Sequence, residues 1–312
     1  MRTSQFERLV GYPSGQRGQT VNLLAHAFDG SNPSPTTIPL FVHCELKYCL
    51  TGAVALLAFP AALTASAIVS PPLPSATNVL NQVIERAAQV ARDGNDEKYS
   101  YAKRTLTQEL NSQGEVIQST EKKYQVLLVR GWPFSRLVQI QGQQLSEADI
   151  RKEDEREQQF RSKLEGRDLK KMREKKEAWI KPELLARFNF NVISNAVYAN
   201  RQTWILEFKP KAGAPENTVQ DRIYNRIAGL LWIDEEDAEI ARVEAHLNKD
   251  LSLGWLGMLG SLKTCDLTLE RQRMPEGVWV NAKQILLLVG RKLFSTMRYR
   301  AAEESSGFQR EP

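Results

Sequence analysis

Few residues in this chain of 312 are of the types that perform nucleophilic catalysis. It contains three His and three Cys, and beyond residue 67 only His246 and Cys265 remain. A Ser or Cys nucleophile usually needs a neighbouring base, and no Ser lies in a G-x-S-x-G sequence. His246 alternates with Arg242 and Glu244 on the polar side of a predicted strand, so we expect an exposed strand histidine. The pattern predicts a protein that is not an enzyme, although catalysis by carboxylates alone stays open.

Metal and nucleotide sites are not indicated either. One His and one Cys give no recognisable zinc spacing. The acidic run Asp234-Glu235-Glu236-Asp237 could attract calcium, but it lies between two predicted strands, and we interpret it as a solvated hairpin turn. The glycines form neither G-x-x-x-x-G-K nor G-x-G-x-x-G, so no nucleotide is implied. We therefore expect no metal and no cofactor.

The composition is that of an ordinary soluble globular protein, with 25% charged and 42% hydrophobic residues. This excludes collagen-like, disulfide-scaffold and wholly disordered chains. The 42 Lys and Arg exceed the 37 Asp and Glu by five, and the excess is interleaved with acidic residues instead of forming a basic block. We expect no nucleic-acid partner.

An uncharged, Gly-punctuated apolar run occupies residues 253–260, between two predicted strands. One interpretation is a buried bulge or strand crossing, because most apolar runs lie in cores. The other is a flexible loop that makes a peripheral membrane contact or covers a ligand cavity. The candidate residues of this membrane or lid loop are Trp255, Leu256, Met258 and Leu259.

The N-terminal residues 1–45 do not have the pattern of a folded protein. Residues 10–37 are rich in Gly, Ser, Pro, Asn and Gln and lack any sustained periodicity. Residues 30–33 can be encoded by GGT TCG AAT CCN, which resembles the T-loop of a transfer RNA gene, and residues 19–23 by a stem around a GTA anticodon. We interpret 1–45 as a spurious leader translated from a transfer RNA gene, with the true start near residues 40–46. A genuine polar leader is the alternative.

Residues 46–67 have the layout of a secretory signal peptide. Lys47 supplies a positive n-region, residues 50–63 form an uncharged apolar h-region, and residues 65–67 are an A-x-A cleavage site. We therefore predict a periplasmic protein, cleaved near Ala67.

A permanent membrane anchor is not predicted. The apolar run is shorter than the roughly 20 residues that a membrane-spanning helix needs, and Pro60 interrupts it. A lipoprotein would need a Cys after the h-region, whereas Cys44 and Cys49 precede it. Residues 68–76 follow as a Pro-rich extended linker.

The remaining sequence predicts one helix followed by many strands. The helix begins at Thr77 or Asn78 and stops at Gly94, because apolar residues recur three and four positions apart. Alternation predicts about nine or ten strands, two pairs of which form hairpins across residues 111–114 and 274–277. The predicted strands cover residues 99–110, 115–129, 136–141, 200–208, 228–234, 238–247, 261–271, 278–290 and 294–300.

The fold class is therefore mainly β (α+β): a curved antiparallel sheet or unclosed β-barrel in a domain of residues 77–302. Residues 147–178 are dense in mixed charge and predict a long, solvated helical insertion of one or two helices. A nucleic-acid or membrane-binding role for this insertion is the weaker alternative. Residues 303–312 are expected to be a disordered tail.

An exported chain with this order of elements resembles the bacterial outer-membrane lipoprotein carrier and receptor family. The segments that carry the resemblance are residues 99–101, 131–140, 204–210, 229–234 and 242–247. The resemblance implies an unclosed barrel that cups acyl chains under helical lids. The chain departs from the family in its charged insertion.

Two functions follow from these expectations. The first is an exported, non-enzymatic carrier or binding protein whose concave face holds a lipid or lipoprotein acyl chain. The second is an envelope structural or interaction protein with a packed core, which binds a partner protein through the charged helix. The expected lipid-lining residues are Trp204, Leu206, Phe208, Leu231, Val243 and Leu286.

Overall fold

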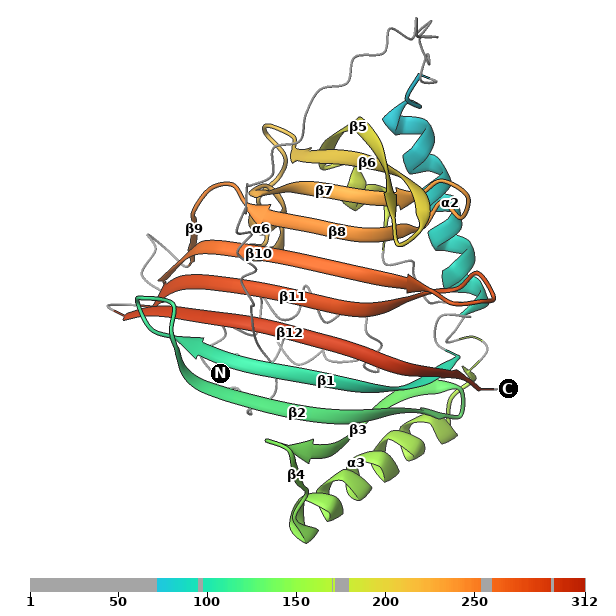
Figure 1. The fold of residues 1–312 in the computed structure, drawn as a ribbon, viewed down its shortest axis with the longest axis vertical. Coiled ribbons are helices and arrows are strands. Elements are labelled where there is room, and N and C mark those ends of the chain that lie inside the picture. The colour runs from blue at the N-terminus through green and yellow to red at the C-terminus, as the bar shows by residue number, and fades with distance from the viewer. Residues whose placement is uncertain are drawn as a thin grey trace, which may run out of the picture.

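The computed structural model describes residues 72–94, 98–169, 171, 180–253, 260–292 and 295–311. Within these ranges a single antiparallel sheet of twelve strands carries four helices (Figure 1). The helices are α2 (Ala76–Asp93), α3 (Glu147–Glu165), α5 (Pro182–Leu185) and α6 (Val219–Tyr224). The strands are β1 (Tyr99–Leu110), β2 (Val116–Val129), β3 (Trp132–Ile140), β4 (Gln143–Gln144), β5 (Phe188–Tyr198), β6 (Arg201–Pro210), β7 (Ile227–Asp234), β8 (Ile240–Leu247), β9 (Leu251–Leu253), β10 (Gly260–Arg273), β11 (Trp279–Lys292) and β12 (Ser295–Arg310).

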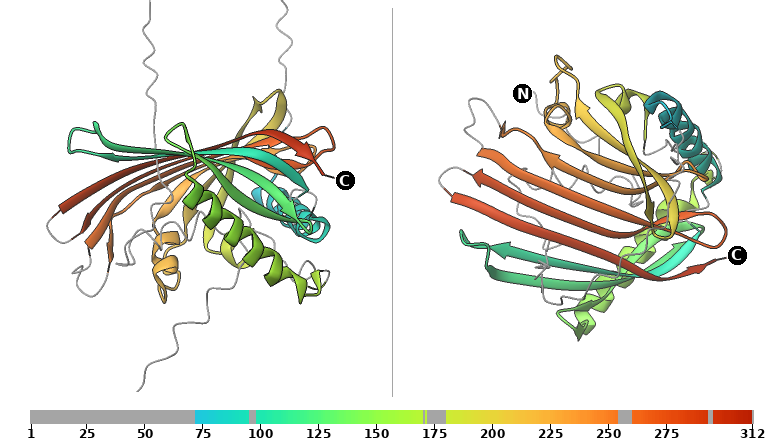
Figure 2. Two further views of the ribbon diagram at one scale, coloured as in Figure 1. Left: turned by 90° about the horizontal axis from the view of Figure 1, so that it is seen from below. Right: turned by 45° about the horizontal axis from the view of Figure 1, so that its top comes forward.

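The sheet is open. Its strand order is β4-β3-β2-β1-β12-β11-β10-β8-β7-β6-β5, with β9 pairing to β10 beside this path. Figure 2 shows it as a curved layer with the helices on its concave side. The predicted class, a mainly β fold with an unclosed antiparallel sheet and helices, is confirmed.

The two faces of the sheet differ in chemistry. Directly opposed residues share a face, and an apolar row crosses the concave side through Leu206, Leu231 and Val243. A row of alternating charge crosses the convex side, where Glu270 lies opposite Arg242 and Lys283. The same row continues to Glu304 and Arg104, whose side chains lie 3.4 Å apart. The convex face is therefore suited to water, and the concave face needs cover.

Helix α2 covers one part of the apolar face. Ser75 caps its N-terminus by accepting a hydrogen bond from the Asn78 amide, so the cap lies two or three residues before the predicted one. Gly94 ends it as expected, with a left-handed φ of 59°. The buried side chains of α2, at spacings of four residues, are Val79, Val83, Ala87 and Ala91.

Helix α3 is the described part of the charged insertion, and its helical prediction is confirmed over Glu147–Glu165. Leu164 is buried against Val129, Trp132 and Phe134. The Glu153 carboxylate is also buried, and it accepts a hydrogen bond from the Leu137 amide at 3.0 Å. One side of the helix is thus part of the fold and not fully solvated.

The predicted disordered tail at 303–312 is wrong. Residues 295–310 form β12, which lies between β11 and β1 near the middle of the sheet. Its polar residues find partners across the strands, as where Glu303 contacts Lys103 at 3.6 Å. A strand that is polar in composition is ordered here because both of its neighbours pair with it.

The acidic turn at 234–237 is also not the simple solvated turn that was expected. Asp234 is fully buried, binds Arg201, and accepts hydrogen bonds from the amides of Glu236 and Asp237. Burial alone would raise the pKa of Asp237, but hydrogen bonds from Arg273 and the Trp279 indole hold that pKa below its usual range.

Beside this turn, a buried ion pair ties α2 to the sheet. Glu239 binds Arg271 at 2.6 Å, and both side chains are about 5% exposed. Arg86 of α2 reaches the same carboxylate at 3.2 Å and donates to the Gly277 carbonyl at 3.2 Å. Removing one partner of such a pair would leave a buried charge unpaired, at a cost of about 3–5 kcal/mol.

One glycine of β7 is required by close backbone packing. A Cβ on Gly229 would lie 1.9 Å from the Glu244 carbonyl oxygen of β8. We therefore expect Gly229→Ala to force the strands apart and to lower the free energy of unfolding by about 1–3 kcal/mol or more. Gly166→Ala is the matched control, because a Cβ there meets no atom within 4 Å. Urea titration of both variants measures this, and an equal, small effect in the two would contradict it.

Candidate functional site

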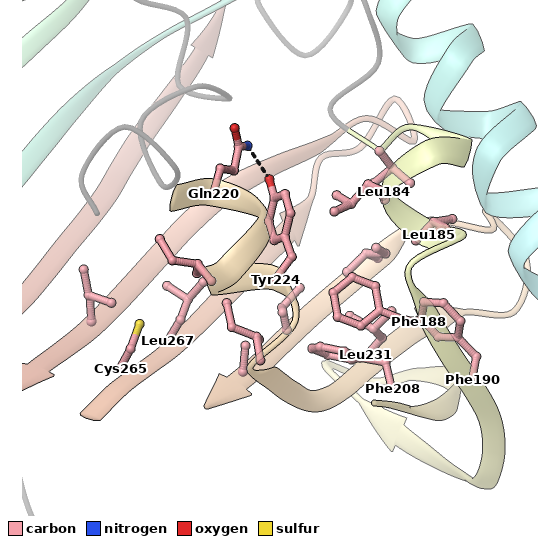
Figure 3. A pocket seen from close by; sticks show the side chains of 17 residues that line it. Leu184, Leu185, Phe188, Phe190, Phe208, Gln220, Tyr224, Leu231, Cys265 and Leu267 are labelled. Carbon is pink, nitrogen blue, oxygen red and sulfur yellow. Dashed lines mark hydrogen bonds between the residues drawn. The ribbon is translucent and has the colours of Figure 1, made fainter. Parts of the chain in front are cut away.

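An apolar cavity of about 220 Å³ lies between the concave face of the sheet and the short helices α5 and α6 (Figure 3). None of its 17 lining residues carries a charge. They are Ile180, Leu184, Leu185, Phe188, Phe190, Phe208, Gln220, Ile223, Tyr224, Ile227, Leu231, Ile240, Val243, Ala245, Cys265, Leu267 and Leu286. Such a wall can hold a hydrocarbon and offers little to a polar metabolite.

The floor of the cavity comes from the strand register. Leu267 of β10 opposes Ala245 of β8 on one side and Leu286 of β11 on the other, so all three share the concave face. A bulge in β8 shifts the pairing so that Ile240 lies opposite Ile233, and Ile240 also lines the cavity. The bulge therefore adds an apolar side chain that strict alternation would have placed on the polar face.

The opposite wall is made by α5 and α6. Figure 3 shows Leu184 and Leu185 on α5 and Tyr224 on α6, above the phenyl ring of Phe208 and the side chain of Leu231. The ring centroids of Phe188, Phe190 and Phe208 lie 5.4–6.3 Å apart. These three rings form the wall of the cavity on the β5 side.

Helix α6 is held in place by polar contacts on its outer side. Thr218 and Asp221 form a reciprocal capping box. Arg187, which precedes β5, binds the Asp221 carboxylate and donates to the Pro215 carbonyl at 3.1 Å. Burial would raise the pKa of Asp221, but the hydrogen bonds from Thr218 and the charge of Arg187 lower that pKa. This ion pair keeps the apolar side of α6 turned toward the cavity.

Three residues supply the polar atoms of the lining. Gln220 is exposed at the rim and donates from Nε2 to the Tyr224 hydroxyl at 2.6 Å. Cys265 lies on the floor, and burial raises the pKa of its thiol to about 12, with a smaller contribution from the charge of Asp266. The thiol is therefore protonated at neutral pH, and the cavity stays uncharged.

The structure brings together four of the six predicted lipid-lining residues. Phe208, Leu231, Val243 and Leu286 line the cavity. Leu206 shares their face but is fully buried under α2, and Trp204 packs against the same core. These two residues were predicted to line the groove because alternation identifies a face, whereas α2 decides which part of that face is covered.

The residues of α5 and α6 were missing from the predicted lining. Both helices are short, with four and six residues, so neither shows a helical period. The signal for α5 was Pro182 before an apolar pair, which indicates a short apolar turn or helix over residues 184–190. The signal for α6 was Thr218 with Asp221 three positions later, the pattern of a capping box.

Other predicted features lie apart from the cavity. His246 is exposed on β8, on the polar face as expected. Trp255, Leu256, Met258 and Leu259 lie outside the described residues, so the membrane or lid loop stays a prediction. In the described ranges no group of three or more His, Cys, Asp or Glu is placed to hold a metal ion. No helix among them is long and apolar enough to cross a membrane.

Comparison with known proteins gives distant structural likenesses. No protein-family model and no curated protein matches the sequence. An outer-membrane lipoprotein-sorting protein domain from Vibrio parahaemolyticus is 10% identical, covers 75% of this chain and 94% of its own, and has a TM-score of 0.28. A LolA-superfamily protein from Nitrosomonas europaea is 11% identical, and the match covers 77% of this chain and 95% of that protein with a TM-score of 0.27. A chain of the MucA/MucB complex of Pseudomonas aeruginosa is 9% identical, and the match covers 76% of this chain and 99% of that chain with a TM-score of 0.23.

Two of these three structures bear names of the family that the sequence resembles, and their likeness to this chain is distant. At such identities and TM-scores it says nothing about what this chain binds.

The Cys265 thiol provides a test of the closed, uncharged cavity floor. Only the thiolate reacts readily with iodoacetamide, so with a pKa of about 12 we expect slow alkylation at pH 8 and still slow alkylation at about pH 10. Unfolding in urea should restore the rate of an ordinary thiol. Mass spectrometry of the peptide that contains Cys265 measures both rates. Native alkylation that accelerates near the usual thiol pKa of about 8.5 would contradict this description.

Proposed function

We propose that this chain is an exported, non-enzymatic carrier or binding protein of the bacterial cell envelope, which holds an acyl chain of a lipid or lipoprotein. The observation that supports this most is the uncharged cavity on the concave face, lined by aliphatic and aromatic side chains. The signal-like residues 46–67 support export to the periplasm.

The energetic case follows from the lining. Each methylene group that leaves water for the cavity stabilises the complex by about 0.8 kcal/mol. No charged group has to lose its hydration when the chain enters, because none lines the wall. The rim pair Gln220–Tyr224 can hydrogen-bond the polar end of a ligand without drawing a charge into the cavity.

A partner-binding protein with a packed core is the second hypothesis, and the structure favours it less. A core packed at the usual density of about 0.74 leaves no cavity of this size. The charged helix α3 is also engaged within the fold, since Arg136 binds its Glu157 at 2.9 Å and Glu153 is buried. We therefore place contact with an envelope protein second.

Polar substitution of the cavity floor tests the proposal. Leu267→Gln places an amide against the bound chain, and an unpaired buried amide costs about 1–3 kcal/mol, so we expect binding of a fluorescent fatty acid to weaken about 10- to 100-fold. Thr268→Gln is the matched control, because Thr268 is the next residue of β10 and faces the convex side, opposite Glu244. It should bind like the wild type.

Native mass spectrometry of the purified protein supplies the second readout for the same variants. We expect a co-purified or added lipid adduct on the wild type and on Thr268→Gln, and its loss from Leu267→Gln. A wild type that takes up no lipid, or a Leu267→Gln variant that binds as tightly as Thr268→Gln, would overturn the proposal.

A further inference from the structure

Resting on this function, we propose that the ligand enters with one unbranched acyl chain, and that a second chain has no room beside it. Three features carry the inference: the volume of the cavity, what lies on each side of it, and the polar groups at its rim.

The volume limits how much hydrocarbon enters. At about 220 Å³ the cavity lies below the roughly 300–1,000 Å³ of pockets that enclose a drug-sized ligand. If a methylene group occupies the ~30 Å³ of one liquid water molecule, the cavity holds roughly seven methylenes. That is part of one chain.

On the β5–β7 side the apolar face is already filled by the protein. Val79 and Val83 of α2 are each 2% exposed, and they belong to one core with Leu206 and Ile233, both fully buried. A second chain could enter here only by displacing α2, which the Arg86–Glu239 pair ties to the sheet.

On the β12 side the concave face is first covered and then charged. Leu286 of β11 is the outermost cavity residue in that direction, and Ala301 of β12, which lies opposite it, is buried in the same core. Two positions along these strands, Gln284 lies opposite Glu303. Glu303 pairs with Lys103, which is 5% exposed and whose Nζ lies 5.3 Å from the centre of the Tyr124 ring. A chain laid over this pair would remove its remaining water without offering a hydrogen bond in return.

The polar groups at the rim of the cavity determine what the polar end of the ligand can contact. The guanidinium groups at the α6 rim are engaged by the protein: Arg187 binds Asp221, and Arg226 binds Glu216 at 2.8 Å. Arg222 of α6 itself donates to the Ser252 carbonyl at 3.2 Å. The Gln220–Tyr224 pair is neutral. Recognition is therefore of the chain, and the charge of the head group should have little influence on affinity.

A chain-length series tests the inference. The probes are lysophosphatidylcholines with one saturated chain of about six to sixteen carbons, measured by displacement of a fluorescent fatty acid. We expect affinity to rise about fourfold per added methylene until roughly seven are buried, and then to level off. A free fatty acid with the same chain should bind within about tenfold of its lysophosphatidylcholine.

Chain number is tested with phosphatidylcholine that carries two octanoyl chains. It should bind no more than about twofold tighter than the single-chain octanoyl compound. The factor of two arises because either of its two chains can enter the cavity. Binding at least tenfold tighter, or affinity that keeps rising through sixteen carbons, would overturn the single-chain inference and leave the proposed function intact. Failure of every probe to bind would overturn the proposed function itself, and this inference with it.

A larger side chain in the cavity should reduce the number of methylene groups that the cavity can bury. Ala245 lines the cavity and lies opposite Gly229, which has no side chain, so Ala245→Leu should move the levelling-off point to chains about three methylenes shorter. His246→Leu is the matched control on the exposed face of β8 and should leave the series unchanged. If Ala245→Leu melts well below the wild type, Leu267→Phe serves the same purpose. A series that Ala245→Leu and Leu267→Phe both leave unchanged would contradict the assignment of this cavity.

Discussion

The structure depends on one constraint: a wide sheet has an apolar face, and no second sheet among the described residues covers it. Sandwich proteins bury such a face against another sheet. Here α2 covers part of it with a stripe of Val and Ala, and α5 and α6 cover another part with ten residues between them. Ten residues in two separate turns do not fill the space above the six strands that line the cavity, and what remains among the described residues is that cavity. The same shortage of cover that costs packing energy provides the room for a ligand.

Charged groups set the limits of this arrangement. The buried pair Arg271–Glu239, which Arg86 of α2 joins, ties α2 to the sheet. The pair Lys103–Glu303 places two charges on the other half of the concave face, beside the buried Tyr101 and Val126. A hydrocarbon that covered either pair would have to remove its water at a cost in free energy. The apolar surface that a ligand can use therefore lies between the two pairs. The cavity is thus bounded by electrostatics as much as by its apolar walls.

The sequence predicted those parts of the fold whose residues alternate around a buried face. Leu206 and Phe208, or Val243 and Ala245, show their shared face without knowledge of any partner strand. It failed where pairing depends on distant residues. Residues 294–300 were predicted as a strand, but the second half of β12, residues 303–310, was interpreted as part of a tail because Glu303 and Glu304 are polar. The partners of these two residues, Lys103 and Arg104, lie about 200 positions earlier. Strand β5 was missed because Asn189 and Asn191 weaken its pattern at the edge of the sheet.

The site was predictable to a similar extent. The four lining residues that were predicted correctly come from regular strands, whereas Ile223 and Tyr224 belong to a helix too short to have a period. The difference between a lining residue and a core residue, as between Phe208 and Leu206, is set by where α2 lies, and no local pattern encodes that position.

In the proposed function an acyl chain occupies the space between α6 and the sheet. The most direct measurement is a crystal structure of the protein with a single-chain lipid brominated at its terminal carbon, because bromine is located by anomalous scattering independently of the protein density. The account predicts a bromine peak among Leu231, Leu267 and Leu286 on the cavity floor. A peak on the outer surface, or over the Lys103–Glu303 pair, with side chains filling the cavity, would contradict it.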